Sequence, residues 1–310
     1  MKVFFIVKPL NYNALKQLYN SIEKTFDKKK DSIHILKTSK KKHAIDLTQK
    51  AIEEKADVVV ACGGDGTVNE VARGLVKTEI PIAVVPVGSG NGIARHFKIP
   101  SGISNAIQLI KKKKIAKMDV GVVNGHYFFG NMGCALESHF ICIYNKNGSH
   151  GIWAYIIAFF NAIINFKHQK ILIQYQKEIK QISPFVFLVS NTNQQGYNFS
   201  LTPQALSDDG QLDLFWMEKS SLIKKIKFII YTLMGRRLKS KDYNLIKLST
   251  LKIILLDPGN FCVQIDGEYL PLTSKNLEFP KEKTICSITL SVICSKLLSD
   301  SNLKISAFSS

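Results

Sequence analysis

The sequence predicts an α/β domain with a parallel sheet, followed by a β-rich, sandwich-like domain. Strand and helix patterns alternate over the first third of the chain, short strands separated by turn residues fill the rest, and two glycine-rich turns follow apolar strands. Alternating strands and helices are typical of a parallel sheet that is covered on both faces. The 310 residues suffice for two domains. We place the boundary near residue 116, giving domains 1–116 and 117–310.

The elements of the first domain follow from hydrophobic periodicity. Continuous β-branched runs predict strands buried on both faces, and apolar residues at helical spacing predict the helices between them. The predicted strands are Val3–Val7, Ser32–Lys37, Val58–Cys62 and Ile82–Val87, and the predicted helices are Asn13–Phe26 and His43–Lys55. Parallel sheets bind ligands at the carboxyl ends of their strands. Both glycine-rich turns fall at such ends, so we expect them to share one crevice.

After Lys114 the pattern changes to short alternating stretches, as in an antiparallel β domain. Helical insertions are predicted near Gly151–Phe166 and Ser220–Ser240, and the C-terminal stretch Ile285–Leu298 is expected to return to the first domain. The predicted strands are Met118–Asn124, Tyr127–Asn131, Lys170–Tyr175, Phe185–Asn191, Leu212–Met217, Leu251–Leu256 and Cys262–Ile265.

The net charge of +18 favours anionic partners such as nucleotides or acidic lipid headgroups. The lysine runs lack interleaved aromatic residues, so we expect no nucleic-acid partner; single runs are equally explained as solvated faces. Six cysteines without C-x-x-C spacing are typical of reduced core residues in an intracellular protein. No stretch reaches the roughly 20 apolar residues of a membrane span. We therefore expect a cytoplasmic protein.

The stretch Cys62–Val71, which reads CGGDGTVNEV, is the first candidate site. Its glycines let backbone amides approach a polyanion closely. Asp65 suits a metal ion or metal-bound water that accompanies a nucleotide, which indicates a nucleotide phosphate site. Thr67 and Glu70 form a T-x-x-E capping box that starts a helix, or they contact the ligand directly.

The stretch Pro86–Gly92 repeats the order of strand, glycine turn and helix. Such turns are common and only weakly specific alone, but the pairing with the first motif about twenty-five residues upstream is specific. Ser89 and Asn91 can donate hydrogen bonds to phosphate or ribose oxygens.

Asp266 and Glu268 are the third candidate site. Phosphoryl transfer needs a carboxylate that takes the proton of the attacking hydroxyl. On a straight strand the two side chains would face the same way. Gly267 makes a tight turn equally plausible, and a solvated hairpin is the structural alternative.

The two glycine motifs together strongly resemble the catalytic domain of the diacylglycerol kinase and sphingosine kinase superfamily of lipid kinases, and most of all its soluble bacterial diacylglycerol kinase-like members. The resemblance covers nearly the whole chain and continues through Met118–Gly121, Tyr127–Asn131, Asn191–Leu214 and Gln264–Glu268. It implies a Rossmann-like, NAD kinase-like domain that binds ATP, a β-rich domain for the lipid, and an active site in the cleft between them.

The resemblance also implies roles for individual residues. Asp266 and Glu268 would lie beside the lipid hydroxyl, with Glu268 the favoured general base, and Asp65 is the third predicted catalytic residue. A structural Mg²⁺ would be held by the Asp209 carboxylate and by the carbonyl groups of Leu206 and Gln211. The residues expected to face ATP are Thr38, Gly63, Gly64, Asp65, Gly66, Thr67, Asn69, Glu70, Gly88, Ser89 and Asn91.

Three motifs depart from the family pattern. Lys8–Asn11 replaces the Asn-Pro that often begins the first turn, and Gly88–Gly92 replaces the G-T-x-N-D form of the second turn and is nearer the sphingosine-kinase form. Gly133–Ser138 replaces the common G-x-G-x-D-A, with Glu137 keeping a carboxyl group. His96 is assigned no chemistry, because such a histidine more often caps or packs a helix.

A basic amphipathic segment, Ile223–Arg237, suits an anionic membrane surface, and the aromatic helix near Trp153–Phe160 is a second candidate. Packing of both helices on the β domain is the alternative. The sequence thus predicts a peripheral, ATP-dependent lipid kinase that phosphorylates diacylglycerol or a sphingoid-type lipid. The alternatives to a lipid kinase are an NAD kinase-like enzyme and a catalytically silent lipid-binding relative. The oligomeric state, including a homodimer, stays open.

Overall fold

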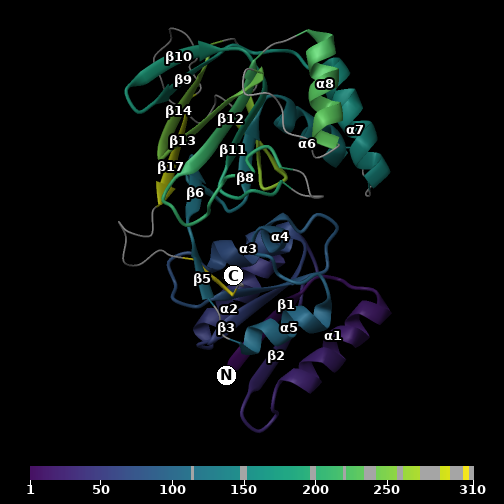
Figure 1. Cartoon of the computed structure of the whole chain (residues 1–310). Coiled ribbons are helices and arrows are strands. Elements are labelled where there is room, and N and C mark those ends of the chain that lie inside the picture. The colour runs from purple at the N-terminus through teal and green to yellow at the C-terminus, as the bar shows by residue number, and fades with distance from the viewer. Residues whose placement is uncertain are drawn as a thin grey trace.

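The computed structural model describes residues 1–112, 115–146, 152–195, 200–218, 221–233, 242–256, 261–272, 287–293 and 303–306. An α/β domain with a parallel sheet lies below a larger domain of antiparallel sheets in Figure 1. This arrangement confirms the fold class that the sequence predicts.

The first domain is built on a six-stranded sheet in the order β2-β1-β3-β4-β18-β5. The first four of these strands are parallel, and β5 runs antiparallel to β18. The strands are β1 (Lys2–Val7), β2 (Ser32–Lys37), β3 (Val58–Gly63), β4 (Ile82–Pro86), β5 (Ile115–Met118) and β18 (Leu303–Ser306). The apolar runs of β1 and β3 are fully buried, as their continuous β-branched and aromatic residues predict.

Helices cover this sheet on both faces (Figure 1). Helix α1 packs against α5, and α2 packs against α3. The helices are α1 (Tyr12–Thr25), α2 (His43–Glu53), α3 (Asp65–Leu75), α4 (Gly92–His96) and α5 (Ile103–Lys111). Helices α3 and α4 each begin directly after a glycine turn, at the carboxyl ends of β3 and β4.

The second domain is a sandwich of two six-stranded sheets that share an apolar core. One sheet has the order β10-β9-β14-β17-β6-β7, and the other has the order β13-β12-β11-β8-β15-β16. The strands are β6 (Val120–Val123), β7 (His126–Phe128), β8 (Asn131–Cys134), β9 (Ile171–Tyr175), β10 (Glu178–Ile182), β11 (Pro184–Ser190), β12 (Leu212–Glu218), β13 (Asn244–Leu248), β14 (Thr250–Leu255), β15 (Phe261–Ile265), β16 (Glu268–Leu272) and β17 (Ser287–Ile293).

Three helices cover the outer face of the second sheet: α6 (Leu136–Lys146), α7 (Ile152–Asn165) and α8 (Leu222–Leu233). They enclose a separate apolar cluster with residues of β11 and β12. Strand β11 is therefore buried on both faces, with Phe187 in the sandwich core and Leu188 under the helices. No helix among the described residues has the length and hydropathy to cross a bilayer.

The C-terminal segment differs from the sequence expectation. Ser287–Ile293, within the stretch expected to return to the first domain, instead pairs with β14 and β6 in the sandwich. The strand that joins the first sheet is β18, further along the chain, which lies between β4 and β5. The chain first crosses between the domains at Asp119, between β5 and β6. Of the helix predicted near Ser220–Ser240, Ser220 and residues 234–240 lie outside the described residues.

Candidate active site

The two glycine turns meet backbone to backbone at the carboxyl edge of the first sheet. A Cβ atom on Gly88 would lie 2.5 Å from the Cα atom of Gly64, and one on Gly64 would lie 3.2 Å from the Cα atom of Gly88. A side chain on Gly88 would displace the facing turn, and one on Gly64 would be tightly crowded. The crevice expected from the two turns therefore exists.

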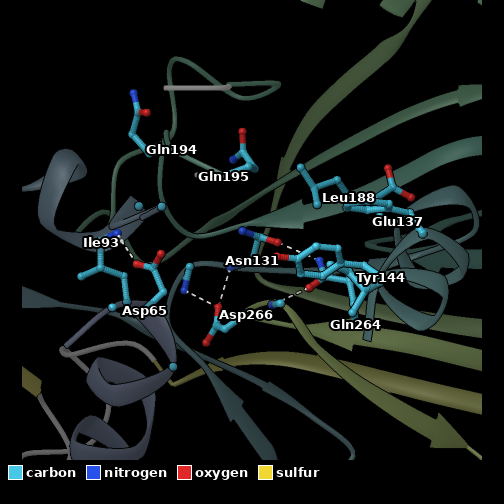
Figure 2. Close-up of a pocket in the computed structure, with 18 of the residues that line it drawn as sticks. Asp65, Ile93, Asn131, Glu137, Tyr144, Leu188, Gln194, Gln195, Gln264 and Asp266 are labelled. Carbon is cyan, nitrogen blue, oxygen red and sulfur yellow. Dashed lines mark hydrogen bonds between the residues drawn. The ribbon is translucent and has the colours of Figure 1, made fainter. Parts of the chain in front are cut away.

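Asp65 joins the two turns. It is the first residue of α3, and its Oδ1 accepts a hydrogen bond from the Ile93 amide at 3.2 Å, in the first turn of α4 (Figure 2). Asn91 holds the second turn closed, because its side chain accepts from the Gly88 amide and donates to the Gly88 carbonyl. The Asn91 side chain, expected to face ATP, thus bonds within its own turn. Asp65 and Ser89 line the pocket described below.

Thr67 and Glu70 do not form the expected capping box. Helix α3 begins at Asp65 with Gly64 as its N-cap, so Thr67 lies inside the first turn. The Thr67 side chain packs over Gly63, where an added Cβ would approach its Oγ1 to 2.2 Å. The capping box would need Thr67 as the N-cap of the helix. Because β3 ends at Gly63, the helix begins about one turn before that position.

Glu70 instead caps a different helix. Its carboxylate accepts hydrogen bonds from the Lys42 amide at 2.8 Å and the Ala44 amide at 3.2 Å, at the start of α2. Lys42 is the N-cap of α2 but offers no side-chain bond of its own, so Glu70 satisfies amides that would otherwise lack a partner. Thr38 bonds to the Val7 carbonyl, and neither Thr38 nor Glu70 is among the described residues that line the pocket.

Asp266 sits in the two-residue turn between β15 and β16. Asp266 and Gly267 both have positive φ, at 49° and 82°, as a hairpin turn of the D-G type requires. The carboxylate accepts four N–H donors: the Phe129, Gly130 and Asn131 amides at 2.8 to 2.9 Å, and the side-chain amide of Asn69. Burial raises the pKa of Asp266, and these four donors oppose the rise.

Glu268 points to a different partner. It begins β16, pairs in register with Ile265, and forms an ion pair with Lys41 at 3.0 Å. The tight turn at Gly267, rather than a straight strand, separates its side chain from that of Asp266. Glu268 is not among the described residues that line the pocket. Of the three predicted catalytic carboxylates, the pocket thus brings together Asp65 and Asp266.

The pocket has a volume of about 400 Å³ and two chemically different ends. At one end lie the glycine turns, Lys8, Asp65 and Asp266. The other end extends between β11 and the three helices of the second domain. Its apolar lining consists of Leu136, Phe140, Ile141, Tyr144, Phe159, Val186, Leu188, Leu201 and Phe228. Such a cavity can hold a phosphorylated group and a hydrocarbon chain at the same time.

Polar residues join the two ends of the pocket. The Gln264 side chain donates to Asn131 Oδ1 at 2.7 Å and accepts from the Gly267 amide at 2.9 Å (Figure 2). Four pocket residues, Asn131, Gln264, Lys8 and Gln194, are not among the site residues that the sequence predicts. Gln264 stands inside the motif that suggested Asp266, and its polar side chain in an otherwise apolar strand was the available signal.

The loop expected to bind a structural Mg²⁺ is held by protein groups. The Asp209 carboxylate pairs with Lys247 and accepts from the Gln211 amide at 3.1 Å. The Gly210 amide bonds to Asp119 at 2.7 Å. Carboxylate and carbonyl oxygens suit a hard cation. However, the Lys247 ammonium group already meets the Asp209 carboxylate, so the loop as it lies does not fit the ion.

His96 links the domains. Its ring nitrogens bond to Asn193 Oδ1 at 2.8 Å and Ser207 Oγ at 2.9 Å, both in the second domain. Burial lowers the pKa of His96, so the neutral ring is favoured. This packing role agrees with assigning it no chemistry. The Arg73 side chain makes a further link by donating to the Tyr127 carbonyl at 3.3 Å.

Comparisons with known proteins agree with this architecture. Residues 2–123 match the model of the diacylglycerol kinase catalytic domain, and residues 144–288 match the YegS C-terminal NAD kinase beta sandwich-like domain. Diacylglycerol kinases of Staphylococcus epidermidis and Staphylococcus aureus are each 30% identical over 237 residues, which is 74% of this chain and 74% and 75% of those proteins.

Solved structures share the fold over the full length. The crystal structure of a diacylglycerol kinase from Bacillus anthracis superposes with a TM-score of 0.71 at 20% identity, covering 99% of this chain and 97% of that one. A second structure from the same organism has a TM-score of 0.75 at 22% identity, covering 99% and 96%.

Proposed function

The chain belongs to the diacylglycerol kinase family and is a lipid kinase, and from this premise we propose that it transfers the γ-phosphate of ATP to the free hydroxyl of diacylglycerol. One observation carries the proposal. A single pocket runs from two abutting glycine turns, with Asp65 and Asp266 beside them, into an apolar chamber between β11 and the helices α6, α7 and α8. We call the first of these the phosphate end of the pocket and the second its lipid end. The hydroxyl of a two-chain lipid would thereby reach the phosphate end while its hydrocarbon stays buried.

The groups at the phosphate end of the pocket suit the binding of Mg·ATP as a substrate. Amides of the glycine turns and the Lys8 ammonium group can hold phosphate oxygens. Asp65 lies where it can bind the magnesium ion that accompanies ATP. Phosphoryl transfer then depends mainly on positioning and charge neutralisation, with one carboxylate to accept the hydroxyl proton.

Asp266 and Glu268 compete for the role of proton acceptor. The place of Asp266 in the pocket wall and its raised pKa support Asp266, although its oxygens already accept four bonds. A substrate hydroxyl can reach it by displacing Asn69, the only side chain among those four donors. Glu268, favoured by the family pattern, would have to leave Lys41 to do the same.

The test is a radiolabelled-ATP assay with dioleoylglycerol in mixed micelles, with sphingosine and NAD as competing acceptors. We expect label in phosphatidic acid, and a loss of at least a hundredfold in rate for Asp65→Asn and Asp266→Asn. The exposed Asp46→Asn is the control and should keep wild-type activity. Preferential labelling of NAD would indicate an NAD kinase-like enzyme. No labelled product from any acceptor would indicate a silent lipid-binding relative.

We propose further that the protein meets its substrate at an anionic bilayer through α7. Trp153, Ile157, Phe160 and Ile164 follow one another at helical spacing and are all exposed, Trp153 and Ile164 by 76% and 78%. The buried Ala158 and Ala162 face the domain. A helix with one apolar face open to solvent suits the membrane interface, where tryptophan is favoured.

Two further observations favour a bilayer over a protein partner. Phe159 of α7 and Phe228 of α8 line the lipid end of the pocket, so the helix that carries the exposed apolar face also forms part of the wall of the proposed acyl chamber. Lys224 on α8 is exposed, and the chain carries a net charge of +18, which attracts acidic lipid headgroups.

The two tryptophans give a direct assay, because Trp216 is buried and Trp153 is exposed. Vesicles of phosphatidylglycerol and phosphatidylcholine should shift the emission of Trp153 to the blue at low salt. Ile157→Glu should abolish the shift, whereas Ile179→Glu, an equally exposed apolar position on β10, should not. No shift with the wild-type protein, or equal loss in both variants, would contradict docking through α7.

A further inference from the structure

Glu137 places a carboxyl group in the lipid end of the pocket, where the phosphoryl-transfer mechanism does not use it. It lies in the first turn of α6 and lines the pocket beside Leu136, Phe140 and Leu188. Its Oε2 accepts a hydrogen bond from the Phe187 amide at 3.2 Å. Figure 2 shows Glu137 next to Leu188, at the far end of the pocket from Asp65. A charged group would be unfavourable at this apolar position.

The surroundings favour the neutral acid. Burial raises the pKa of Glu137 to about 8, and the backbone amides of Glu137 itself and of Phe187 oppose this only in part. Near neutral pH the side chain is therefore a carboxylic acid, with one O–H donor that the Phe187 amide cannot use because that amide is itself a donor. The side chain keeps some accessible surface because it faces the pocket.

Glu137 also ends a row of polar groups that starts at the phosphate end. Asp266 accepts from the Asn131 amide, and the Asn131 side chain accepts from Gln264. Gln264 and Glu137 both lie close to the Cα atom of Gly133, where an added Cβ would meet the Glu137 Cβ at 2.8 Å and the Gln264 amide nitrogen at 3.1 Å. A lipid whose hydroxyl sits near Asp266 would lay its next few atoms along this row.

Diacylglycerol has polar atoms at the corresponding place. Its acyl ester groups lie between the free hydroxyl and the hydrocarbon chains, and an ester carbonyl only accepts hydrogen bonds. On the basis of the proposed function, we propose that Glu137 donates a hydrogen bond to an acyl-ester carbonyl of the lipid and so selects ester-linked substrates. It is then a specificity-determining residue rather than a participant in phosphoryl transfer.

A purely structural role for Glu137 makes a different prediction. Strand β8 ends at Cys134, so the Phe187 amide on β11 has no strand partner there and Glu137 supplies one. If this were its whole role, removing the carboxyl group would weaken the site for every lipid alike. Ester recognition requires that the loss depend on the carbonyl group of the substrate.

The experiment compares dioleoylglycerol with the matching dioleyl ether lipid, which has the same hydroxyl and chains but no carbonyl. We expect the wild-type protein to prefer the ester by about tenfold in kcat/KM, since the ether lacks the carbonyl oxygen that the donor would meet and its ether oxygen is a weaker acceptor at a different position. Glu137→Gln, which can still donate, should keep most of this preference. Glu137→Leu should bring the ratio near one by losing rate on the ester.

Phe140→Leu, which changes the apolar wall nearby, is the matched control and should lower both rates by similar factors. Thermal unfolding verifies that each variant folds, and Glu137→Met replaces the leucine variant if that one does not. An unchanged ester-to-ether ratio in the variant without a donor would overturn the inference. Faster, Glu137-dependent phosphorylation of sphingosine would overturn it too, because Glu137 would then pair with an amine. If the wild-type protein phosphorylates neither glycerolipid, the proposed function itself fails.

Discussion

Glu137 should make the stability of the protein fall as the pH rises. The pKa of this side chain is about 8 in the folded protein, against an ordinary value of 4.5. Below about pH 4.5 both the folded and the unfolded chain hold the proton, so the group adds no pH dependence. Between 4.5 and 8 the unfolded chain has lost the proton and the folded chain still binds it. Unfolding then releases a proton, and higher pH favours it.

The size of the effect follows from the same two values. The release of one proton on unfolding makes the free energy of unfolding fall by up to about 1.4 kcal/mol per pH unit. Between pH 4.5 and 8 the total decrease is therefore at most about 5 kcal/mol. Water in the pocket reduces this figure, because Glu137 lines a cavity rather than a packed core. Above pH 8 both states are ionised, and the contribution becomes constant.

Urea unfolding at half-unit steps from pH 5 to 8.5 measures this prediction. Glu137→Gln keeps the shape and the bond to the Phe187 amide but cannot ionise, so its advantage over the wild-type protein should grow with pH. Glu53 is exposed, so Glu53→Gln is the control, and its free energy of unfolding should change with pH as that of the wild-type protein does. A constant difference between wild type and Glu137→Gln across this range would refute a neutral carboxylic acid at this position.

Three further predictions concern the phosphate end and its supports. Gly88→Ala places a methyl group 2.5 Å from the Cα atom of Gly64 in the facing turn, so the affinity for ATP, measured by calorimetry, should fall at least tenfold. Gly102→Ala is the control, because its added methyl group would have its nearest neighbour at 3.7 Å, and it should bind ATP as the wild-type protein does. Asn69→Ala removes a donor that lowers the pKa of Asp266, so the acidic limb of the pH–rate profile should move to higher pH; an unmoved limb would argue against Asp266 as the proton acceptor. Lys247→Met removes the ammonium partner of the partly buried Asp209 carboxylate, so the thermal midpoint should fall; an unchanged midpoint would show that this ion pair does not stabilise the loop.

Features fixed by neighbours in sequence could be predicted. The strands that lead into Gly63 and Gly88 are apolar runs, and the turns after them need glycine, so strand, turn and helix are all visible locally. Their convergence follows from parallel strands that end at one edge. The sequence allows two interpretations of the D-G turn at Asp266, because the two-residue spacing of Asp266 and Glu268 fits a straight strand and a hairpin equally well.

Features that depend on partners far along the chain could not be predicted. Glu70 has the sequence of a capping box but caps α2, since its distance to the Lys42 and Ala44 amides depends on how α2 and α3 pack. The apolar end of the pocket was missed for a related reason. Phe140 and Phe159 have the same chemistry as core residues, and only the packed helices determine that they line a cavity.

The contacts that close the two domains over the site also include the groups proposed to act in it. Asp266 accepts Asn69 from the first domain and three amides from the second, so its carboxylate is part of the domain interface. A lipid hydroxyl that displaces Asn69 would remove one interdomain bond as it enters. Because His96 still holds Asn193 and Ser207, the domains would stay together. Substrate entry would therefore release Asp266 for proton transfer while His96 still links the two domains.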